Sequence, residues 1–431
     1  MKLAMCIRTV LALTLMLTAG CKGRRAGETS AYTHQIVDMC RPCHGRQVAQ
    51  WSASMHARAH TDSVYNRYFI KASQESGRRL ETFCARCHTP LGVLRGEIPF
   101  ARAPRRPADT RVSAVATEGV QCDFCHTIAG YDRLENGGYR LAAARVMRGP
   151  LKDARSPMHG TAYDPLFRRS ELCGTCHNVT HPQNGIVLES TFSEWRASPH
   201  ARRGVSCQDC HMTAGLTRRI VRPGQAGHGG PPRPHIADHF FVGPNLIYSS
   251  RDDSAQGREL RRLSAELLRR AARLEIGEPV QRGERIAVPI TVRNVGAGHG
   301  LPTGVTELRQ IWLDVAVKDA RGREVLRSGA LDARGELGAE AIIFRTEVFD
   351  AAGRLTTKFW NTVRKGRDHR VPAGGSVTEH VPLPDGVAWP LKIEAALKYR
   401  SVAPSGLAEV DAPRDLVAIP VITMTAASRT L

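Results

Sequence analysis

Apolar and polar residues alternate in the last third of the chain. Every second residue is apolar in three runs of this part, and turn-forming residues lie at 319–322 and 373–375. A period of two is the pattern of a half-buried β-strand, and several such strands between turns are typical of a β-sandwich. We therefore predict an immunoglobulin-like β-sandwich at 277–431. The alternating apolar residues are Ile286, Val288, Ile290 and Val292; Ile311, Leu313, Val315 and Val317; and Leu391, Ile393, Ala395, Leu397 and Tyr399.

The segment before the alternating runs has the period of a helix. Leu260, Leu263, Leu267, Ala271 and Leu274 fall on one helical face, and arginines occupy the other faces. A basic amphipathic helix can lie on a membrane surface, and it can equally connect two domains. We predict an amphipathic connector helix at 249–276 that packs on the region before it.

Ten of the twelve cysteines form five copies of one pattern, Cys-x-x-Cys-His. Two thiols three positions apart can each bond one vinyl group of a single haem, and the adjacent histidine then supplies the proximal nitrogen to the iron. Cys-x-x-Cys is also half of a zinc site, but zinc sites need half-sites in pairs, and five is odd. We number the motifs 1 to 5 and predict five c-type haems. The motifs are Cys40, Cys43 and His44; Cys84, Cys87 and His88; Cys122, Cys125 and His126; Cys173, Cys176 and His177; and Cys207, Cys210 and His211.

The motifs define a pentahaem cytochrome c domain at 35–248. It offers only about 40 residues per haem, which is too little chain to bury a core unaided. Helices and loops that wrap around the porphyrins are therefore expected. The overall prediction is a multidomain chain, in which a mainly α-helical and irregular multihaem cytochrome c domain precedes the β-sandwich.

The N-terminus carries a short apolar run behind Lys2 and Arg8, at 10–17, followed by small residues at 18–20. This pattern predicts a signal peptide at 1–20, too short to span a bilayer in the mature protein. Cys21 resembles the lipidated cysteine of a bacterial lipobox, so 21–34 is predicted to be a lipidated flexible tether. An ordinary cleaved signal with Cys21 free is the alternative. With Lys22 next, the prediction is an exported protein of the periplasm or cell surface, an outer-membrane lipoprotein.

The chain is basic, with 61 Lys and Arg against 41 Asp and Glu, a formal charge of +20. Haem propionates would offset part of this charge. An exported haem protein makes nucleic acid an unsuitable partner, whereas a basic surface can steer acidic redox partner proteins or small anions. The expected partners are therefore redox proteins, together with the membrane that holds the lipid anchor.

The sixth ligand of each iron decides between a carrier and a catalyst. A second histidine closes the iron for electron transfer, and an empty position lets substrate bind. His56 and His200 are candidates because both occur in the same sequence, Trp-x-x-Ser-x-His-Ala, at 51–57 and 195–201. The other candidates are His159 ahead of motif 4, His239 after motif 5, and His299 in a loop of the β domain. Spacing alone does not pair them with irons.

These residues resemble a known group, the multihaem c-type cytochromes related to the tetrahaem carrier that accepts electrons from hydroxylamine oxidation. The resemblance covers roughly 35–245 and rests on the five motifs, the segment 118–122, the segment 171–178 and the shared tryptophan–histidine sequence. It implies closely packed haem pairs and mostly bis-histidine ligation, with distal roles for His56 and His200 and, by looser similarity, His159 and His239. The fifth motif and the β domain depart from the family.

Two functions follow from the sequence. The first is an electron-transfer lipoprotein that carries electrons through five haems. The alternative is an oxidoreductase that acts on a small nitrogen or sulfur species at one open haem. Ammonia-forming nitrite reductases also bind five haems, but that family usually replaces the histidine of its catalytic motif with lysine, and all five motifs here end in histidine.

Overall fold

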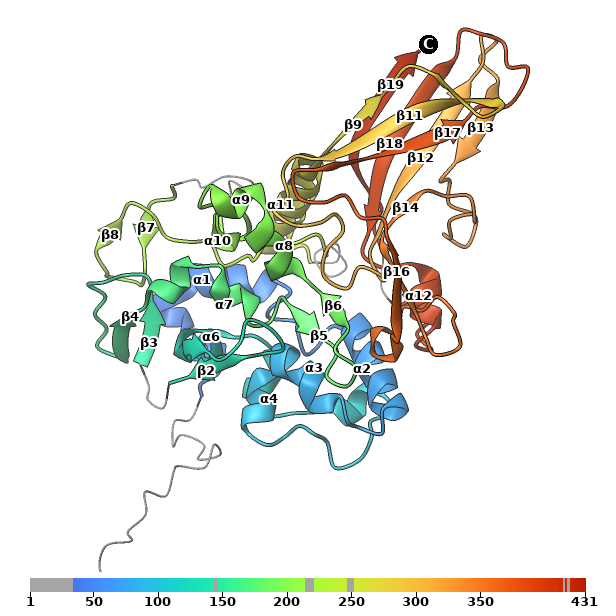
Figure 1. The fold of residues 1–431 in the computed structure, drawn as a ribbon. Coiled ribbons are helices and arrows are strands. Elements are labelled where there is room, and N and C mark those ends of the chain that lie inside the picture. The colour runs from blue at the N-terminus through green and yellow to red at the C-terminus, as the bar shows by residue number, and fades with distance from the viewer. Residues whose placement is uncertain (1–33, 143–145, 214–220, 246–251, 414, 417–418) are drawn as a thin grey trace, which may run out of the picture.

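The computed structural model describes residues 34–142, 146–213, 221–245, 252–413, 415–416 and 419–431. A region of helices and short strands precedes a region of long strands, as Figure 1 shows. This is the predicted division of the chain. The predicted signal peptide and almost all of the tether, including Cys21, lie outside the described residues. None of the described helices is both long enough and apolar enough to cross a membrane.

The haem-motif region is built from short helices, and each motif lies on or next to one of them. In the described part of this region, successive strands pair only in two-stranded ribbons. The helices are η1 (Val37–Met39), α1 (Arg41–Ala53), α2 (Ser63–Glu75), α3 (Glu81–His88), α4 (Pro90–Leu94), η2 (Pro107–Thr110), α5 (Ala114–Thr117), α6 (Cys122–Thr127), η3 (Pro165–Arg168), α7 (Glu171–Gly174), α8 (Thr191–Ala197), α9 (Pro199–Arg202) and α10 (Cys207–His211). The ribbons are β1 (Ile128–Tyr131) with β2 (Tyr139–Leu141), β3 (Val146–Gly149) with β4 (Gly160–Tyr163), β5 (Val179–Thr180) with β6 (Val187–Glu189), and β7 (Gly224–Gln225) with β8 (Pro232–Arg233).

The repeated tryptophan–histidine sequence is also a structural repeat. In both copies the indole N–H donates to the carbonyl of a valine just ahead of a later motif. The N–H of that valine donates to the carbonyl of the copy's histidine. The members are Trp51, Val120 and His56 in the first copy and Trp195, Val205 and His200 in the second, with distances of 2.9 and 3.0 Å in each.

The connector helix is shorter than predicted. Helix α11 covers Ala255–Ala271, and the Ser254 hydroxyl caps its N-terminus by accepting from the Gly257 N–H at 3.0 Å. The predicted helix end is wrong, because Ala272–Ile276 forms strand β9. Its side chains alternate between buried and exposed, and Leu274 and Ile276 point into the core. Leu274 fits a helical face equally well, so the helix period alone did not reveal the change.

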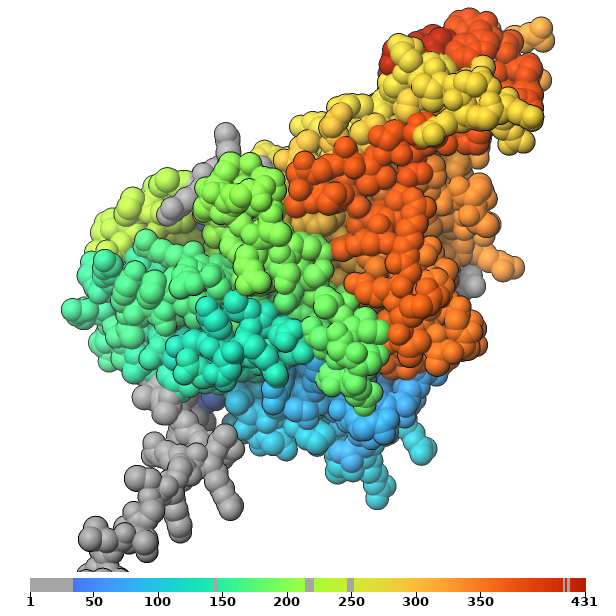
Figure 2. All heavy atoms as spheres, in the orientation of Figure 1, coloured from blue at the N-terminus to red at the C-terminus, as the bar shows by residue number. Residues whose placement is uncertain are grey.

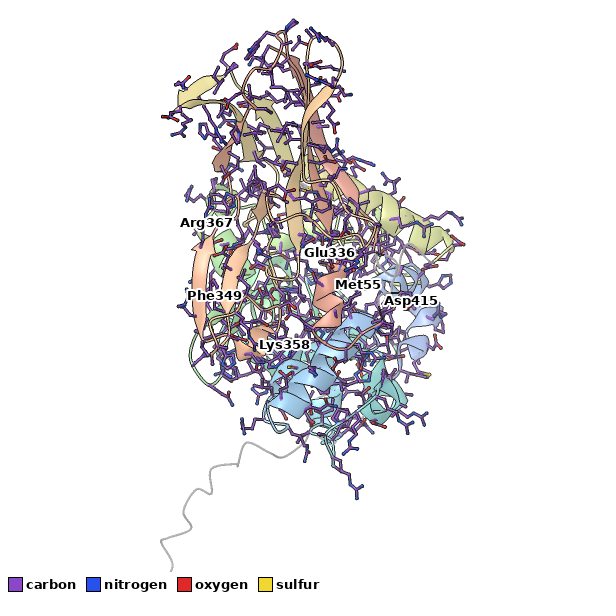
Figure 3. All side chains as sticks on the ribbon, turned by 90° about the vertical axis from the view of Figure 1, so that its right-hand side faces the viewer. Met55, Glu336, Phe349, Lys358, Arg367 and Asp415 are labelled. Atoms are coloured by element: carbon purple, nitrogen blue, oxygen red, sulfur yellow. The ribbon has the colours of Figure 1, made fainter. Side chains whose placement is uncertain are left out.

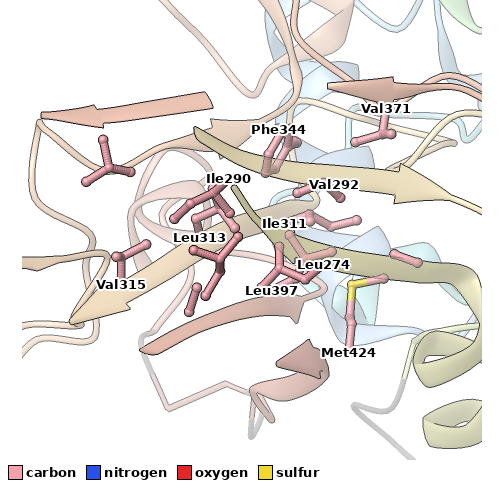
Figure 4. Packing of buried hydrophobic residues seen from close by; sticks show 14 of the residues in the cluster. Leu274, Ile290, Val292, Ile311, Leu313, Val315, Phe344, Val371, Leu397 and Met424 are labelled. Carbon is pink, nitrogen blue, oxygen red and sulfur yellow. The ribbon is translucent and has the colours of Figure 1, made fainter. Parts of the chain in front are cut away.

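Two antiparallel sheets face each other in the C-terminal region. The first contains β9, β10 (Val280–Arg282), β11 (Arg285–Asn294) and β17 (Ser376–Pro382). The second contains β12 (Gln310–Lys318), β13 (Glu324–Ser328), β14 (Ile343–Phe344), β18 (Lys392–Arg400) and β19 (Ile422–Thr430). Figure 4 shows their shared apolar core, in which Ile290 and Val292 of one sheet meet Ile311, Leu313 and Leu397 of the other. The region is β-rich, as predicted, and its immunoglobulin-like identity stays a prediction.

The second sheet continues into elements that pack on the haem-motif region. A hairpin of β15 (Thr346–Phe349) and β16 (Arg364–Asp368), with η5 (Phe359–Asn361) and α12 (Pro404–Ala408), lies beside α2. The Glu75 carboxylate at the end of α2 accepts hydrogen bonds from Lys358, which Figure 3 labels, and from Trp360 and Asn361, at 2.8–2.9 Å. A shared apolar cluster lies beneath these bonds, so the two regions form one packed body. The cluster is Tyr68, Ala72, Leu80, Leu308, Trp360, Val402, Leu407, Val410 and Ala412.

Candidate haem sites

One large cavity runs through the haem-motif region, and its volume is about 2330 Å³. Pockets for a single drug-sized ligand usually hold about 300–1,000 Å³, so this cavity has room for several large groups. All ten motif cysteines and all five motif histidines line it. The five candidate distal histidines, His56, His159, His200, His239 and His299, line it as well. The predicted site residues are therefore gathered around one space.

The local fold of each motif directs its cysteines and histidine to the same side. In motifs 1 and 4 the histidine N–H donates to the carbonyl of the first cysteine at 2.9 Å, which closes one helical turn. Polar caps start two of the other turns. The Gln121 side chain accepts from the Asp123 N–H at 2.5 Å, and Ser206 forms a capping box with Asp209. Residues three and four apart on such a turn face the same way.

The second nitrogen of each motif histidine is already engaged. When Nδ1–H is held by an acceptor, the tautomer is fixed and Nε2 is left free to bind a metal. Four of the five donate Nδ1–H to a backbone carbonyl, whereas His177 has a carboxylate oxygen of Glu189 at 3.6 Å. The four are His44 to Ala226 at 2.8 Å, His88 to Ala59 at 3.2 Å, His126 to Arg148 at 2.6 Å and His211 to Val242 at 2.5 Å.

Four motif histidines face a second histidine at nearly constant separation. Two metal–nitrogen bonds of about 2 Å, plus about 1.1 Å from each nitrogen to its ring centre, give about 6.2 Å between the rings of two histidines that bind one metal from opposite sides. The observed separations match this length, so an iron fits between each pair. The pairs are His44 with His159 at 6.4 Å, His177 with His56 at 6.3 Å, His126 with His239 at 6.5 Å and His211 with His299 at 6.4 Å.

His88 of motif 2 differs from the other four. Ring contacts in the described part of the chain pair it with no histidine; its neighbour is Tyr65. The two rings are stacked with centroids 4.0 Å apart and planes 6° apart, which is too close for a metal between them. Tyr65 therefore packs against the flat face of the His88 imidazole and does not lie where a second ligand of the same metal would be. His60, a nearby histidine, has its Nδ1 at 2.8 Å from the Thr89 hydroxyl and is not among the described residues that line the cavity.

His200 is the one predicted distal histidine that the structure does not bring opposite a motif histidine. Its side chain lies beside the loop of His299, where a Cβ added at Gly298 would meet the Cβ and Cγ of His200 at 3.2 and 3.3 Å. Its Nδ1 is buried and has no hydrogen-bond partner among the described residues. The structural repeat therefore gives His56 and His200 the same local setting but different neighbours across the cavity.

Burial keeps most of these imidazoles in the neutral form that can bind a metal. It lowers the pKa of His56 to about 3 and the pKa values of His211 and His239 to about 4. His177 is the exception: burial would lower its pKa, but the Glu189 carboxylate outweighs burial and raises the pKa to about 9. A carboxylate partner of this kind makes a metal-binding imidazole a stronger donor.

Buried polar atoms without partners in the described residues also line the cavity. Such atoms are costly unless a group in the cavity satisfies them. Haem propionates accept hydrogen bonds, so they could satisfy those of the buried atoms that are donors. The atoms are His200 Nδ1, Gln208 Oε1, Arg233 Nε, Glu307 Oε1 and Tyr399 Oη. No group of three or more His, Cys, Asp or Glu in the described part of the chain is arranged to hold a bare metal ion, as a zinc site would require.

The motifs lie next to one another through their cysteines. The sulfur atoms of motif 4 are neighbours of Cys87 in motif 2, on one side, and of Cys207 in motif 5, on the other. Cys125 of motif 3 is also a neighbour of motif 4, and Cys122 of motif 3 is a neighbour of Cys40 in motif 1. Motif 4 is therefore central, and motif 3 links it to motif 1.

Three side chains that matter here were not singled out from the sequence. Glu189 and Tyr65 contact motif histidines from neighbouring elements outside the motifs, and Glu194 holds the loop of His299. None of the three lies in a motif or repeat, so their sequence context offers no signal.

Comparison with known proteins supports the haem interpretation. Residues 39–127 match the family model described as cytochrome c554 and c-prime. The whole fold is similar to the crystal structure of a penta-haem cytochrome c552 from Thermochromatium tepidum, with a TM-score of 0.63 and 21% identity. That match covers 92% of this chain and 99% of that one. A structural genomics target, SoR45, superposes with a TM-score of only 0.15 and supports no argument. No curated protein matches.

The resemblance predicted from the sequence is thereby confirmed. The chain resembles the multihaem c-type cytochromes, and its fold has an N-terminal helical region that carries the haem motifs and a C-terminal β-rich region.

Proposed function

We propose that this protein is an electron carrier that holds five covalent c-type haems, numbered here as their motifs. The single observation that carries the proposal is the spacing of the four histidine pairs, each of which matches two axial ligands of one iron. Six-coordinate bis-histidine haems exchange electrons but have no vacant position for substrate. The haem supplies the redox chemistry, and this chain fixes its ligands, excludes water and sets its potential.

The proposed path follows the contacts between the motifs. Haem 4 is the junction, because its cysteines neighbour those of motifs 2, 3 and 5. Haem 1 is reached through haem 3. Among the ten motif cysteines only Cys43 of motif 1 is exposed. The exposed basic side chains of Arg41, Lys152 and Arg155 outnumber the exposed carboxylates of Asp38 and Asp153 there. We propose haem 1 as the point of exchange with an acidic redox partner protein.

The carrier function predicts the result of a reductive titration. The anaerobic holoprotein is expected to accept five electrons per chain in overlapping one-electron steps and to return them to an oxidant. The absorbance of the reduced haems, measured against electrons added, gives the number. Fewer electrons than haems, or haems that are not reoxidised, would contradict a carrier.

A second candidate function rests on His88, which faces no histidine in the described part of the chain. An iron bound there has an open position, as an oxidoreductase for a small nitrogen or sulfur species would need. Cyanide is therefore expected to bind one haem per chain in the resting ferric protein, followed as a loss of high-spin absorbance. No binding would remove this candidate, and equally fast binding to several haems would contradict the four closed pairs.

We also propose that the protein is exported and anchored by a lipid on Cys21, with the periplasm or cell surface as its location. The sequence of the N-terminus is the support, and covalent haem attachment to thiols fits an extracytoplasmic compartment. Cys21→Ser is expected to move the haem protein from the membrane fraction to the soluble fraction. A variant that remains in the membrane fraction would show that another segment anchors it.

A further inference from the structure

His299 belongs to the C-terminal region, although it faces a motif histidine of the N-terminal region. It lies in the loop between β11 and β12, and its ring centroid is 6.4 Å from that of His211. The loop is tied to its own sheets on one side only. The Asn294 side chain donates to the His299 carbonyl at 2.7 Å, and Leu301 and Val371 exchange two backbone hydrogen bonds at 2.9 and 3.0 Å.

The other side of the loop is held by Glu194 of helix α8. One carboxylate oxygen accepts from the Gly300 N–H at 2.9 Å and from the Thr303 hydroxyl at 3.2 Å. Gly300 directly follows His299, so this contact acts one residue from the imidazole. Figure 2 shows the C-terminal region, in orange, directly against the green segment that carries β5, β6 and α8.

Arg370 completes the contact from the C-terminal region. Its guanidinium donates to the second oxygen of Glu194 at 2.6 Å, and Ser190 donates to the same oxygen at 2.6 Å. Two further bonds of 2.8 Å attach Arg370 to Asp368 at the end of β16. The side chains of Arg370 and Glu194 are only 12% and 18% exposed. Burial would raise the pKa of Glu194, but Arg370 and the other donors keep it below its usual value.

A nearly buried ion pair of this kind specifies one geometry, because either charge left alone in that setting would be strongly destabilised. The pair joins the two regions at the position where the loop of His299 enters the haem cavity. Burial, four donors and a second carboxylate on Arg370 all restrict how far that loop can move. Metal ligation tolerates little displacement, since partners that orient a ligand typically change metal affinity about 10–100-fold when removed.

We propose that Glu194 and Arg370 form a latch that holds His299 at ligating distance from the iron of haem 5. The inference rests on the proposed bis-histidine ligation of that haem. Glu194 and Arg370 are positioning residues, because neither reaches the iron and both act through His299. In this account the β-rich region supplies an axial ligand, and the junction between the two regions controls access to haem 5.

The test measures how fast cyanide displaces His299 from haem 5 in the ferric holoprotein. His299→Ala first identifies the spectrum of haem 5, which is expected to become high-spin and to bind cyanide at once. In Glu194→Ala and in Arg370→Met, cyanide is expected to bind haem 5 at least tenfold faster than in the wild type. Added imidazole is expected to restore the low-spin spectrum of His299→Ala.

Glu75→Ala is the matched control, since Glu75 also accepts three hydrogen bonds from the C-terminal region but lies away from His299. It is expected to leave cyanide binding at haem 5 unchanged. Thr303→Val, which removes one weak latch bond, serves if the larger substitutions lose haem. The latch is overturned if cyanide binds haem 5 less than tenfold faster than in the wild type in every latch variant, although His299→Ala still becomes high-spin. If His299→Ala itself stays low-spin, the proposed ligation of haem 5 fails instead.

Discussion

Replacing His56 with alanine is expected to turn one low-spin haem of the resting protein high-spin, whereas replacing His200 leaves the number of low-spin haems unchanged. The two histidines occupy equivalent positions in the same structural repeat. Only His56 lies across from a motif histidine, with its ring 6.3 Å from that of His177. In the proposed ligation, His56→Ala therefore removes the sixth ligand of haem 4, while His177 and both cysteines keep that haem attached.

The measurement is the electron paramagnetic resonance spectrum of the oxidised protein, with the haem content determined on the same sample. Haem content is expected to be the same in both variants. His200→Ala leaves a small cavity beside the His299 loop and is expected to lower stability without changing spin states. A His56 variant that stays fully low-spin, or a His200 variant that gains a high-spin haem, would mean that the distal ligands are assigned wrongly.

Glu189→Gln is expected to raise the midpoint potential of haem 4. Among the five motif histidines only His177 has a carboxylate rather than a backbone carbonyl beside Nδ1. The carboxylate strengthens the imidazole as a donor, which favours ferric over ferrous iron. A tenfold loss of the preference for ferric iron corresponds to about 59 mV for a one-electron couple. Because the Glu189 oxygen is 3.6 Å from Nδ1, we expect a shift of this size and not a larger one.

Spectropotentiometry of the wild type and the variant measures this shift. Glu171→Gln is the matched control. Glu171 lies on α7, the helix of motif 4, but its carboxylate pairs with Arg169 at 2.7 Å and not with His177. Glu171→Gln is expected to change the midpoint potential of haem 4 much less, because solvent partly screens the charge of Glu171. Equal shifts in both variants would show a general effect of charge near haem 4, and no shift in Glu189→Gln would refute the role of Glu189.

The sequence predicted the parts of this protein that depend on local pattern. The period-two runs became β11, β12 and β18 with their apolar residues in the core. The Cys-x-x-Cys-His motifs identified the histidines whose Nδ1 is engaged and whose Nε2 is free. The helix period was misleading at one place, where Leu274 fits both a helical face and the inward face of β9.

The histidines that face the motif histidines could not be predicted from their spacing in the sequence. His56 faces motif 4, which lies more than a hundred residues later, and His299 reaches motif 5 from another region of the chain. Such pairings are set by tertiary packing around the cavity. The shared sequence around His56 and His200 predicted equal roles for the two histidines. In the structure, His56 faces the histidine of motif 4, whereas His200 lies beside the His299 loop and faces no motif histidine in the described part of the chain.

The position of His299 changes how the β-rich region is understood. From the sequence it is an appended domain, whereas in the structure its loop enters the haem cavity and is held there by Glu194. The β-rich region therefore contributes more than its own apolar core: it also carries His299, whose ring faces that of His211 at 6.4 Å. Removal of residues 277–431 is for this reason a poor way to isolate the cytochrome.

Magnetic circular dichroism of the oxidised holoprotein, normalised to its haem content, tests the central claim most directly. Bis-histidine low-spin haems and five-coordinate high-spin haems give separate near-infrared bands. The account predicts four bis-histidine haems from the four histidine pairs and one high-spin haem at His88. Five bis-histidine haems, or more than one high-spin haem in the wild-type protein, would contradict it.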